Sequence, residues 1–384
     1  MDNMKVAIVH DWLTGMRGGE KCLEVFCELF PEARLFTLLH DKGSVSGTIE
    51  KMDITTSFLQ KIPGISRNYR NFLPFFPAAV RSFDLSSYDL VLSSSHCVAK
   101  GARIPAGALH ICYCYTPMRY AWKFFNEYFD REASVKKWAI AKVIGALKSW
   151  DLATNKRVDY FIAISDNVKK RVERFYERDA EVIYPPVDTD EKGAVAEKGG
   201  YYLIVSALVP YKRVDLAVRS FNETGRKLVI IGTGTDLERL KRSSNGNIEY
   251  AGWADDAALK RYYAGCRALV FPGEEDFGIV PVEAQAYGKP VIAYAGGGAL
   301  ETVVPLGVEG HTGKQEHATG VFFHEQTASS LNGAIETFER NERFFDPARI
   351  RQNALRFNRD RFKREVREYI EKKWKEHLKD EEKK

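Results

Sequence analysis

Long apolar runs are missing from this 384-residue sequence, and none approaches the ~20 residues that a membrane-spanning helix needs. Residues 1–6 carry charge and lead directly into a strand-like run, which is unlike the apolar core of a signal peptide. We therefore expect a cytoplasmic protein.

Paired cysteines and clustered histidines are also missing. None of the six cysteines forms a CxxC pair, so we interpret them as reduced thiols packed like small hydrophobic residues. They are scattered along the chain: Cys22, Cys27, Cys97, Cys112, Cys114 and Cys266. The eight histidines are dispersed as well, and none pairs with carboxylates at ligand spacing. The sequence predicts no metal site.

A strong excess of one charge is absent too. The formal net charge is +5 and the basic residues form no single stripe, so we expect no nucleic-acid partner. Hydrophobic residues make up 45% of the chain and charged residues 28%, as in an ordinary globular protein. A chain of 384 residues is too long to fold around one compact core and has about the length of two α/β domains.

Short β-branched runs alternate with longer helical patterns, which is typical of βαβ units and parallel sheets. In the first half we expect strands at residues 6–9, 35–39, 90–92, 109–114 and 160–163. Prolines, acidic residues and a Gly-Gly pair at 184–200 predict a linker. The pattern restarts at residues 202–205, 227–231, 248–250, 268–271, 291–293 and 320–323. We therefore predict two doubly wound, Rossmann-like domains, residues 1–190 and 196–350, facing across a cleft that binds the ligand.

The last segment, residues 359–384, contains no glycine or proline and predicts a charged helix. Apolar residues follow one stripe of it: Phe362, Val366, Tyr369, Ile370, Trp374 and Leu378. We expect this helix to fold back onto the N-terminal domain.

The most informative segment is residues 271–284, FPGEEDFGIVPVEA. An apolar strand ends, a loop rich in glycine and acid follows, and Pro281 indicates a helix start because proline suits the first helical turn. A helix N-terminus can bind a diphosphate. Glu275 and Glu283 can accept hydrogen bonds from vicinal hydroxyls of a ribose and a hexose. Either glutamate alone reads as an ordinary loop acid or helix-start residue, but the two together favour a nucleotide-sugar site.

The spacing of Glu275 and Glu283, E-x7-E, resembles that of glycosyltransferase family 4, whose members are retaining enzymes with the GT-B fold. The likeness covers nearly the whole chain, through VAIVHDWLTGMRGGE, SSSHCVAKG, YTPMRYAW, LVPYKRVDLAV and GGGALETV, which are similar to prokaryotic mannosyltransferases of polysaccharide biosynthesis. It implies that Glu275 contacts the transferred sugar and Glu283 the ribose, without a metal ion or cofactor. It also implies that backbone groups of Phe277, Gly278 and Ile279 line the sugar and diphosphate, with Val280 as a further donor-binding residue.

Three other segments fit the same site. Gly18 and Gly19 follow the first strand at an expected helix start, where a phosphate or acceptor could approach, although a simple βα turn is the alternative. Lys212 and Arg213 follow the first strand of the second domain, where a cation would offset the charge of the leaving diphosphate. Residues 296–298 are three glycines before a helix, either an anion cradle or a flexible connection.

The site for the nucleotide base is less clearly marked. Gly232 and Trp253 follow successive strands of the second domain, at positions where the family binds the base. Trp253 could equally pack against a helix. Neither residue distinguishes guanine from uracil.

Two positions depart from the family pattern. Members often carry an arginine five residues before the lysine, where this chain has Ala207, and many carry a histidine where it has Tyr115. Loss of one charged hydrogen bond to the diphosphate would cost ~1.5–3 kcal/mol. Arg213 or Arg119 could replace the missing arginine.

Residues of the first domain could contact an acceptor. His10, Asp11 and His96 follow strands and could hydrogen-bond acceptor hydroxyls, although a lone histidine of this kind is more often structural. Basic and aromatic residues mix at residues 61–81 and again at 119–148. Such faces suit anionic lipid headgroups, and they suit internal helix packing at least as well.

The resemblance thus implies a retaining mannosyltransferase, for which we expect GDP-mannose as the donor and Glu275, Lys212 and Tyr115 as catalytic residues. Its acceptor would be a growing or lipid-linked glycan, reached by transient membrane contact. The alternatives are a UDP-hexose donor or a catalytically silent partner protein that binds a nucleotide sugar, which Ala207 and Tyr115 would favour.

Overall fold

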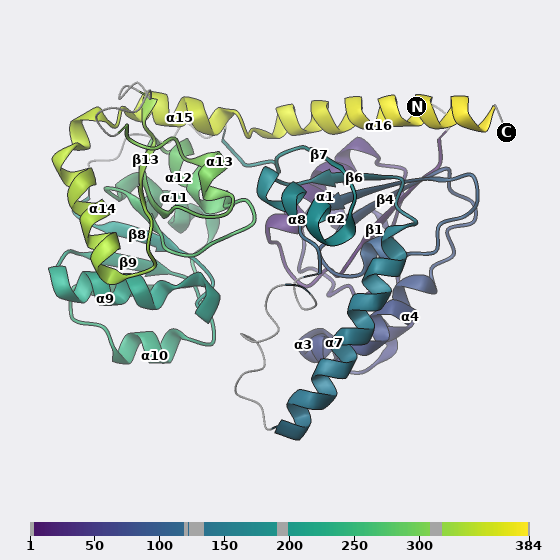
Figure 1. The fold of residues 1–384 in the computed structure, drawn as a ribbon, viewed down its shortest axis with the longest axis horizontal. Coiled ribbons are helices and arrows are strands. Elements are labelled where there is room, and N and C mark those ends of the chain that lie inside the picture. Colours follow the sequence, from purple (N-terminus) through teal and green to yellow (C-terminus); the bar gives the residue numbers. More distant parts are fainter. Residues whose placement is uncertain (1–3, 119–121, 123–133, 190–198, 308–316, 383–384) are drawn as a thin grey trace. The chain divides into compact units, whose positions relative to one another are not determined.

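The chain divides into two compact units, an N-terminal unit of Met1–Pro186 with Asp360–Lys384 and a C-terminal unit of Val187–Arg359. The computed structural model describes residues 4–118, 122, 134–189, 199–307 and 317–382 (Figure 1). Among these residues, no helix combines the length and the apolar character that crossing a bilayer requires.

The N-terminal unit is built on a seven-stranded sheet in which every pairing is parallel. In spatial order its strands are β3 (Asp53–Thr56), β2 (Arg34–Thr37), β1 (Val6–His10), β4 (Leu90–Ser95), β5 (Leu109–Cys114), β6 (Tyr160–Ala163) and β7 (Ala180–Val182). The three central strands β1, β4 and β5 are buried throughout, because helices cover both faces of a parallel sheet. The sequence predicted five of the seven strands and missed the two edge strands, β3 and β7.

Helices and short 3₁₀ turns connect these strands. They are α1 (Gly18–Leu29), α2 (Gly47–Glu50), η1 (Phe58–Lys61), α3 (Ile65–Asn68), η2 (Tyr69–Phe75), α4 (Phe76–Arg81), η3 (Ala99–Gly101), α7 (Ser134–Asn155) and α8 (Asp166–Tyr176). On one face of the sheet, Val9 and Phe36 pack in a buried cluster with Trp12, Tyr69 and Phe76. This cluster uses some of the aromatic side chains of residues 61–81 for internal packing, as the simpler interpretation of that segment predicted.

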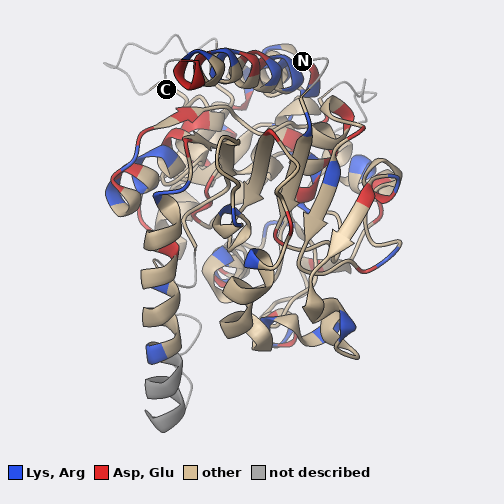
Figure 2. Ribbon diagram, turned by 90° about the vertical axis from the view of Figure 1, so that its right-hand side faces the viewer, with Lys and Arg blue, Asp and Glu red and all other residues tan. Residues whose placement is uncertain are grey.

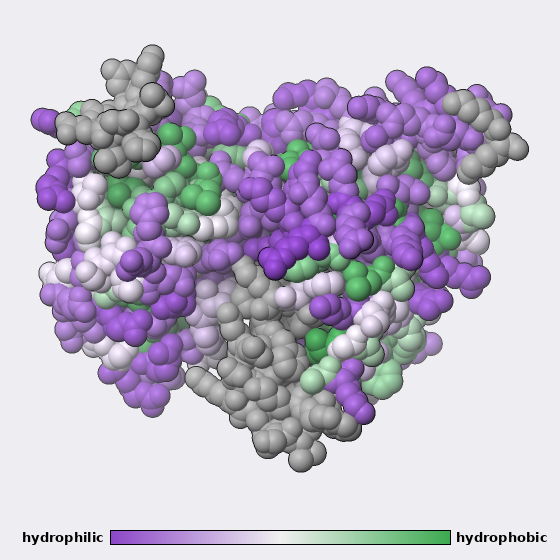
Figure 3. All heavy atoms as spheres, in the orientation of Figure 1, coloured by the Kyte–Doolittle hydropathy of each residue, from purple (hydrophilic) through white to green (hydrophobic). Residues whose placement is uncertain are grey.

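The last helix, α16 (Arg359–Glu381), lies along the N-terminal unit (Figure 1). The ring of Phe362 lies 5.6 Å from those of Phe26 and Tyr113, and Lys363 pairs with Glu28 at 2.5 Å. The predicted apolar stripe is buried only in its first half, since Leu378 near the end of the helix is 44% exposed. Figure 2 shows basic and acidic residues along this helix. In Figure 3 the visible surface of the helix is mostly hydrophilic.

The C-terminal unit contains a six-stranded parallel sheet whose strands the sequence predicted to within a residue or two. In spatial order they are β10 (Ile248–Gly252), β9 (Leu228–Ile231), β8 (Tyr202–Val205), β11 (Leu269–Phe271), β12 (Val291–Tyr294) and β13 (Gly320–Phe323). The connecting elements are η4 (Pro210–Lys212), α9 (Val214–Thr224), α10 (Leu237–Arg242), α11 (Asp256–Gly265), α12 (Ile279–Ala286), α13 (Ala299–Thr302), α14 (Ala328–Arg340), η6 (Glu342–Phe344) and α15 (Pro347–Leu355).

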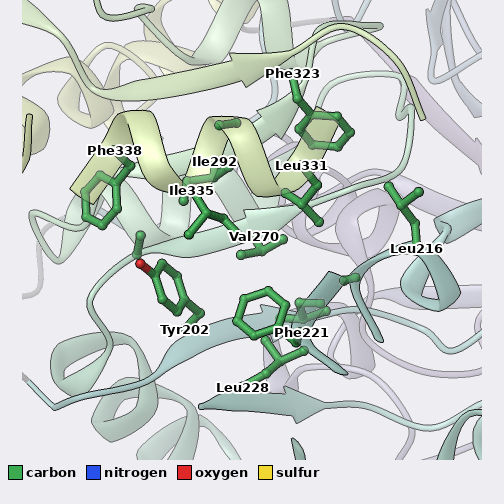
Figure 4. Packing of buried hydrophobic residues seen from close by; sticks show 14 of the residues in the cluster. Tyr202, Leu216, Phe221, Leu228, Val270, Ile292, Phe323, Leu331, Ile335 and Phe338 are labelled. Carbon is green, nitrogen blue, oxygen red and sulfur yellow. The ribbon is translucent and has the colours of Figure 1, made fainter. Parts of the chain in front are cut away.

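Buried aliphatic and aromatic residues hold helices on both faces of this sheet. On one face, Val270 and Ile292 of the central strands pack with Leu331 and Ile335 of α14 (Figure 4). Thr327 begins α14 as a typical N-cap, because its side chain accepts a hydrogen bond from the backbone N–H of Ser330 at 3.2 Å. The predicted α/β class, with two doubly wound Rossmann-like domains, is confirmed.

Each sheet has one point where the chain reverses its direction of winding. From β1 the chain proceeds outward to β2 and β3 and then returns to β4 on the other side of β1. In the same way it proceeds from β8 to β9 and β10 and returns to β11. The connections that follow two such neighbouring strands leave in opposite directions, so the carboxyl ends of these strands border a crevice where ligands bind in open α/β sheets.

Candidate functional site

The reversal point of the C-terminal sheet carries two of the three residues predicted from the sequence to be catalytic, Lys212 and Glu275. Lys212 ends η4, in the connection after β8, and Glu275 lies in the loop after β11. The Lys212 ammonium forms an ion pair with Oε1 of Glu275, and the two side chains are 14% and 23% exposed. A cation and a carboxylate are therefore held side by side in a partly desolvated place, where charges interact more strongly than in bulk water.

Close backbone packing positions the Glu275 loop. A Cβ atom on Gly273 would lie 2.9 Å from the carbonyl oxygen of Lys212, so only glycine lets these two connections approach so closely. On the other side, a Cβ on Gly298 would overlap the backbone of Phe277, and the Gly298 N–H donates a hydrogen bond to the Glu275 carbonyl at 2.9 Å. In the triple glycine of residues 296–298, Gly298 therefore serves as a packing surface for the Glu275 loop.

The helix after this loop begins earlier than the sequence predicted. α12 starts at Ile279, so Pro281 is its third residue and Glu283 lies in its second turn. The difference arises at Gly278, which adopts φ +86°, a left-handed conformation that glycine reaches without steric cost, and so begins the helix two residues before the proline. The first N–H groups of α12 still lack intrahelical partners and remain suited to an anion.

The residues around the start of α12 differ in how much side chain they can offer a ligand. The Phe277 side chain is only 3% exposed and packs against Phe357, with ring centroids 5.4 Å apart. Phe277 can therefore reach a ligand only through its backbone, as the family resemblance implied. Ile279 and Val280, which follow the cap, are half-buried.

Glu283 is fixed by a residue that the sequence analysis missed. The Tyr263 hydroxyl donates a hydrogen bond of 2.9 Å to Oε2 of Glu283, and the Tyr263 ring stacks on Tyr287 with centroids 5.5 Å apart. Burial, together with the Glu283 carboxylate, raises the pKa of Tyr263 well above its usual value, so this phenol stays a donor. Glu283 is half-buried and is held in one orientation by this contact.

Arg213 is held by a second missed residue, Gln326. Its Nη1 donates to Oε1 of Gln326 at 2.7 Å, and Nε2 of Gln326 donates to the Pro272 carbonyl at 3.4 Å. Arg213 itself has φ +53°, which is uncommon for a residue other than glycine and concentrates at functional sites. Gln326 follows β13 by three residues, so its position at the carboxyl edge of the sheet was the signal that could have revealed it.

The predicted base-binding residues lie at neighbouring connections of the same unit. Gly232 has φ +139°, and a Cβ there would overlap the Ser206 carbonyl, so a structural need explains this glycine. Trp253 is 77% exposed, so the alternative of a tryptophan packed against a helix is wrong. Ala207, the departure from the family pattern, is exposed in the connection after β8.

In the N-terminal unit, Gly18 and Gly19 begin α1, as expected. The Tyr115 hydroxyl donates to the Gly19 carbonyl at 2.8 Å and lies 2.8 Å from Oγ of Ser94. Tyr115 is only 9% exposed, and its hydrogen bond to Gly19 holds the first turn of α1. Its catalytic role stays a prediction.

Some sequence-predicted residues lie outside the part of the chain that the structure describes. Arg119 lies outside the described residues, as do the rest of 119–121 and 123–133 of the basic and aromatic stretch and most of the expected linker. In the part of the chain that is described, no group of three or more His, Cys, Asp or Glu side chains could hold a metal ion.

Two family models match consecutive parts of the chain. Glycosyltransferase Family 4 matches residues 39–191, and Glycosyl transferases group 1 matches residues 188–357. The chain belongs to glycosyltransferase family 4.

Curated relatives match this family 4 chain over shorter stretches. An uncharacterized glycosyltransferase of Methanocaldococcus jannaschii is 30% identical over 153 residues, which are 38% of this chain and 43% of the relative. The GDP-mannose-dependent monoacylated alpha-(1-6)-phosphatidylinositol monomannoside mannosyltransferase of Corynebacterium glutamicum is 30% identical over 152 residues, 33% of this chain and 40% of the relative. The chain thus spans less than half the length of these relatives.

Solved structures share the fold over nearly the full length. HepE of Anabaena, in a crystal structure with UDP and glucose, superposes with a TM-score of 0.66 and 16% identity, covering 96% of this chain and 100% of that one. At this identity the likeness concerns the fold alone, and it confirms the GT-B architecture that the family 4 resemblance implied.

Proposed function

We propose that this chain is a retaining hexosyltransferase that transfers mannose from GDP-mannose to a glycan or lipid-linked acceptor. The ion pair of Lys212 and Glu275 at the reversal point of the C-terminal sheet is the observation that carries the proposal. The pair brings together a cation that can stabilise the departing diphosphate and a carboxylate that can bind hexose hydroxyls. Glu275 lies in the loop that leads into α12.

In the proposed mechanism, the donor separates the charges of this pair. The diphosphate binds Lys212 and the free N–H groups at the start of α12, which stabilise the negative charge that grows as the hexose leaves. Glu275 then accepts hydrogen bonds from hexose hydroxyls, and Glu283, oriented by Tyr263, accepts them from the ribose. The departing phosphate takes the proton of the acceptor hydroxyl, so the reaction needs no metal ion.

The donor is the finer part of the proposal. The Corynebacterium relative is GDP-mannose-dependent by name, whereas HepE was crystallised with UDP and glucose. Nucleotide release measured with GDP-mannose, UDP-glucose and UDP-galactose separates the two donor classes. Binding by calorimetry without release from any of these donors would instead indicate a catalytically silent binding protein.

Substitutions at the ion pair test the mechanism. We expect Lys212→Ala and Glu275→Gln each to lower kcat/KM for donor turnover by about one to two decades, because each removes a charged contact of about 1.5–3 kcal/mol. The matched control is Lys241→Ala, which removes a lysine paired with Glu238 at 3.9 Å on α10 of the same unit and should leave turnover unchanged. Wild-type rates in Lys212→Ala would refute the assigned role.

We also propose that the segment between Asp53 and Asp84 contacts anionic lipid when the acceptor is lipid-linked. This stretch has four basic residues and no acidic one. Phe58 and Phe75 are 45% and 56% exposed, which suits insertion between headgroups. Flotation with phosphatidylglycerol vesicles at low salt should recover the wild type and lose Phe58→Ser/Phe75→Ser; absence of wild-type binding would remove the idea.

A further inference from the structure

The N-terminal sheet has its own reversal point, between β1 and β4, and two polar side chains meet there. Asp11 directly follows β1 and His96 directly follows β4. The pair thus occupies the same topological position that Lys212 and Glu275 occupy in the C-terminal sheet. In open α/β sheets this position borders a ligand-binding crevice.

The Asp11 carboxylate is fully buried and organises the connection after β4. Its Oδ2 accepts hydrogen bonds from the backbone N–H groups of His96 at 2.7 Å and Cys97 at 3.0 Å. Its Oδ1 accepts from those of Val98 at 2.6 Å and Ala99 at 2.8 Å. Although burial disfavours the charged form, these contacts and His96 hold the pKa of Asp11 well below its usual range, so the group is ionised.

The imidazole of His96 adds a fifth contact to this carboxylate. Its Nδ1 lies 3.0 Å from Oδ2 of Asp11, and the Trp12 ring packs edge-on against it with centroids 4.5 Å apart. The carboxylate can only accept, so Nδ1 carries a proton, and in the Nδ1–H tautomer Nε2 is an acceptor. The side chain is 32% exposed, and Nε2 has no hydrogen-bond partner among the residues that the structure describes.

The structural contacts of this imidazole, which are Nδ1 against Asp11 and ring packing against His10, Trp12 and Tyr115, do not use Nε2. A carboxylate offers about four lone-pair sites, and four backbone N–H groups already occupy those of Asp11. Asp11 would remain satisfied without the His96 side chain. The imidazole instead has the arrangement of a recognition group, with one nitrogen fixed by a buried acid and the other left for a ligand.

We propose that Nε2 of His96 binds a hydroxyl group of the acceptor glycan, with Asp11 as the residue that positions the ring. The inference rests on the proposed function, since it names the acceptor subsite of that reaction. His96 accepts a hydrogen bond from one acceptor hydroxyl and thereby holds the sugar in register, while the hydroxyl that reacts gives its proton to the leaving phosphate.

Acceptor binding without turnover tests this proposal. Calorimetric titration of the full chain with octyl α-D-mannoside, in the absence of donor, should give a Kd that rises about tenfold in His96→Ala, the equivalent of one lost hydrogen bond. His96→Gln, whose amide can still accept a hydrogen bond, should restore most of the affinity. His377→Gln is the matched control, because Nε2 of His377 lies 2.9 Å from the carbonyl of Gly107, which precedes β5 at the opposite edge of the sheet.

A readout on the ring itself separates orientation from folding. In imidazole ¹⁵N spectra, His96 should be the Nδ1–H tautomer, and Asp11→Asn should shift it toward a mixture while the melting temperature reports any unfolding. Failure of the wild type to bind octyl mannoside, or equal binding by His96→Ala, overturns the inference. A chain that binds the mannoside through His96 but releases no nucleotide from any donor keeps this subsite and refutes the proposed activity.

Discussion

At the scale of single residues, His110 in the N-terminal sheet has a hydrogen-bond partner for each of its ring nitrogens. His110, which is fully buried in β5, accepts a hydrogen bond from Oγ of Ser93 at 2.8 Å and donates from Nδ1 to the Arg157 carbonyl at 3.1 Å. A carbonyl can only accept, so Nδ1 carries a proton, and in the neutral ring Nε2 then accepts from the Ser93 hydroxyl. Burial lowers the pKa of His110 to about 4.

This pKa predicts how stability depends on pH. A histidine in the unfolded chain has a pKa of about 6.5, so below this pH the unfolded chain binds a proton that the folded His110 does not bind. The contribution of His110 to the free energy of unfolding is therefore complete above about pH 6.5 and is lost as the pH falls toward about 4. Urea unfolding should show a loss of about 2 kcal/mol from this group between pH 7 and pH 5. His110→Gln should lack that loss, and His377→Gln should keep it. An equal loss in His110→Gln would show that burial of this ring is not the cause.

At the scale of elements, the candidate site depends on connections packed backbone to backbone. The loop after β11 lies between the η4 turn and the glycines before α13, and Gly273 and Gly298 make those approaches possible. A loop wedged in this way holds Glu275 without help from a bound ligand. The arrangement predicts that added volume at these glycines disturbs the site before it disturbs the sheet.

Two alanine substitutions of opposite expected sign test this packing. Gly298→Ala should lower the free energy of unfolding by about 1–3 kcal/mol, as overpacking does, and should slow donor turnover because the Glu275 loop must move. Gly333→Ala, within α14 and facing open space, should raise the free energy of unfolding by about 0.5–1 kcal/mol and leave turnover unchanged. Urea unfolding and nucleotide release measure both. A Gly298→Ala variant with wild-type stability and rate would contradict the account.

The elements also show which parts of the fold can be predicted from the sequence alone. Strands such as β9 and β12 were predictable because they are continuous runs without charged residues that are largely buried on both faces. Three of the four residues of β3 are polar, and β7 has only three residues. Both strands lie at an edge of the sheet, so neither has that pattern. The start of α12 was placed late because a left-handed glycine cap leaves no side-chain signal.

Contacts between distant connections were only partly predictable. Lys212 and Glu275 were assigned to one site from the family resemblance, and the structure brings them into contact. The hydrogen bonds of Tyr263 to Glu283 and of Arg213 to Gln326 join residues far apart along the chain, so no local pattern reveals them. Predicting these pairs requires the order of the strands in the sheet, because that order brings their connections together.

At the scale of the whole molecule, two units of one topology carry different chemistry at equivalent places. The reversal point of the C-terminal sheet holds an ion pair beside a helix start, which suits a charged donor. The reversal point of the N-terminal sheet holds an oriented imidazole, which suits a neutral hydroxyl. This division of charge supports the separation of donor and acceptor recognition between the two units.

The crystal structure of a complex with GDP-mannose tests the central claim most directly. The diphosphate should lie between the Lys212 ammonium and the first N–H groups of α12, with the hexose against Glu275 and the ribose against Glu283. Nucleotide density at another place, with the Lys212–Glu275 pair still closed, would contradict the account.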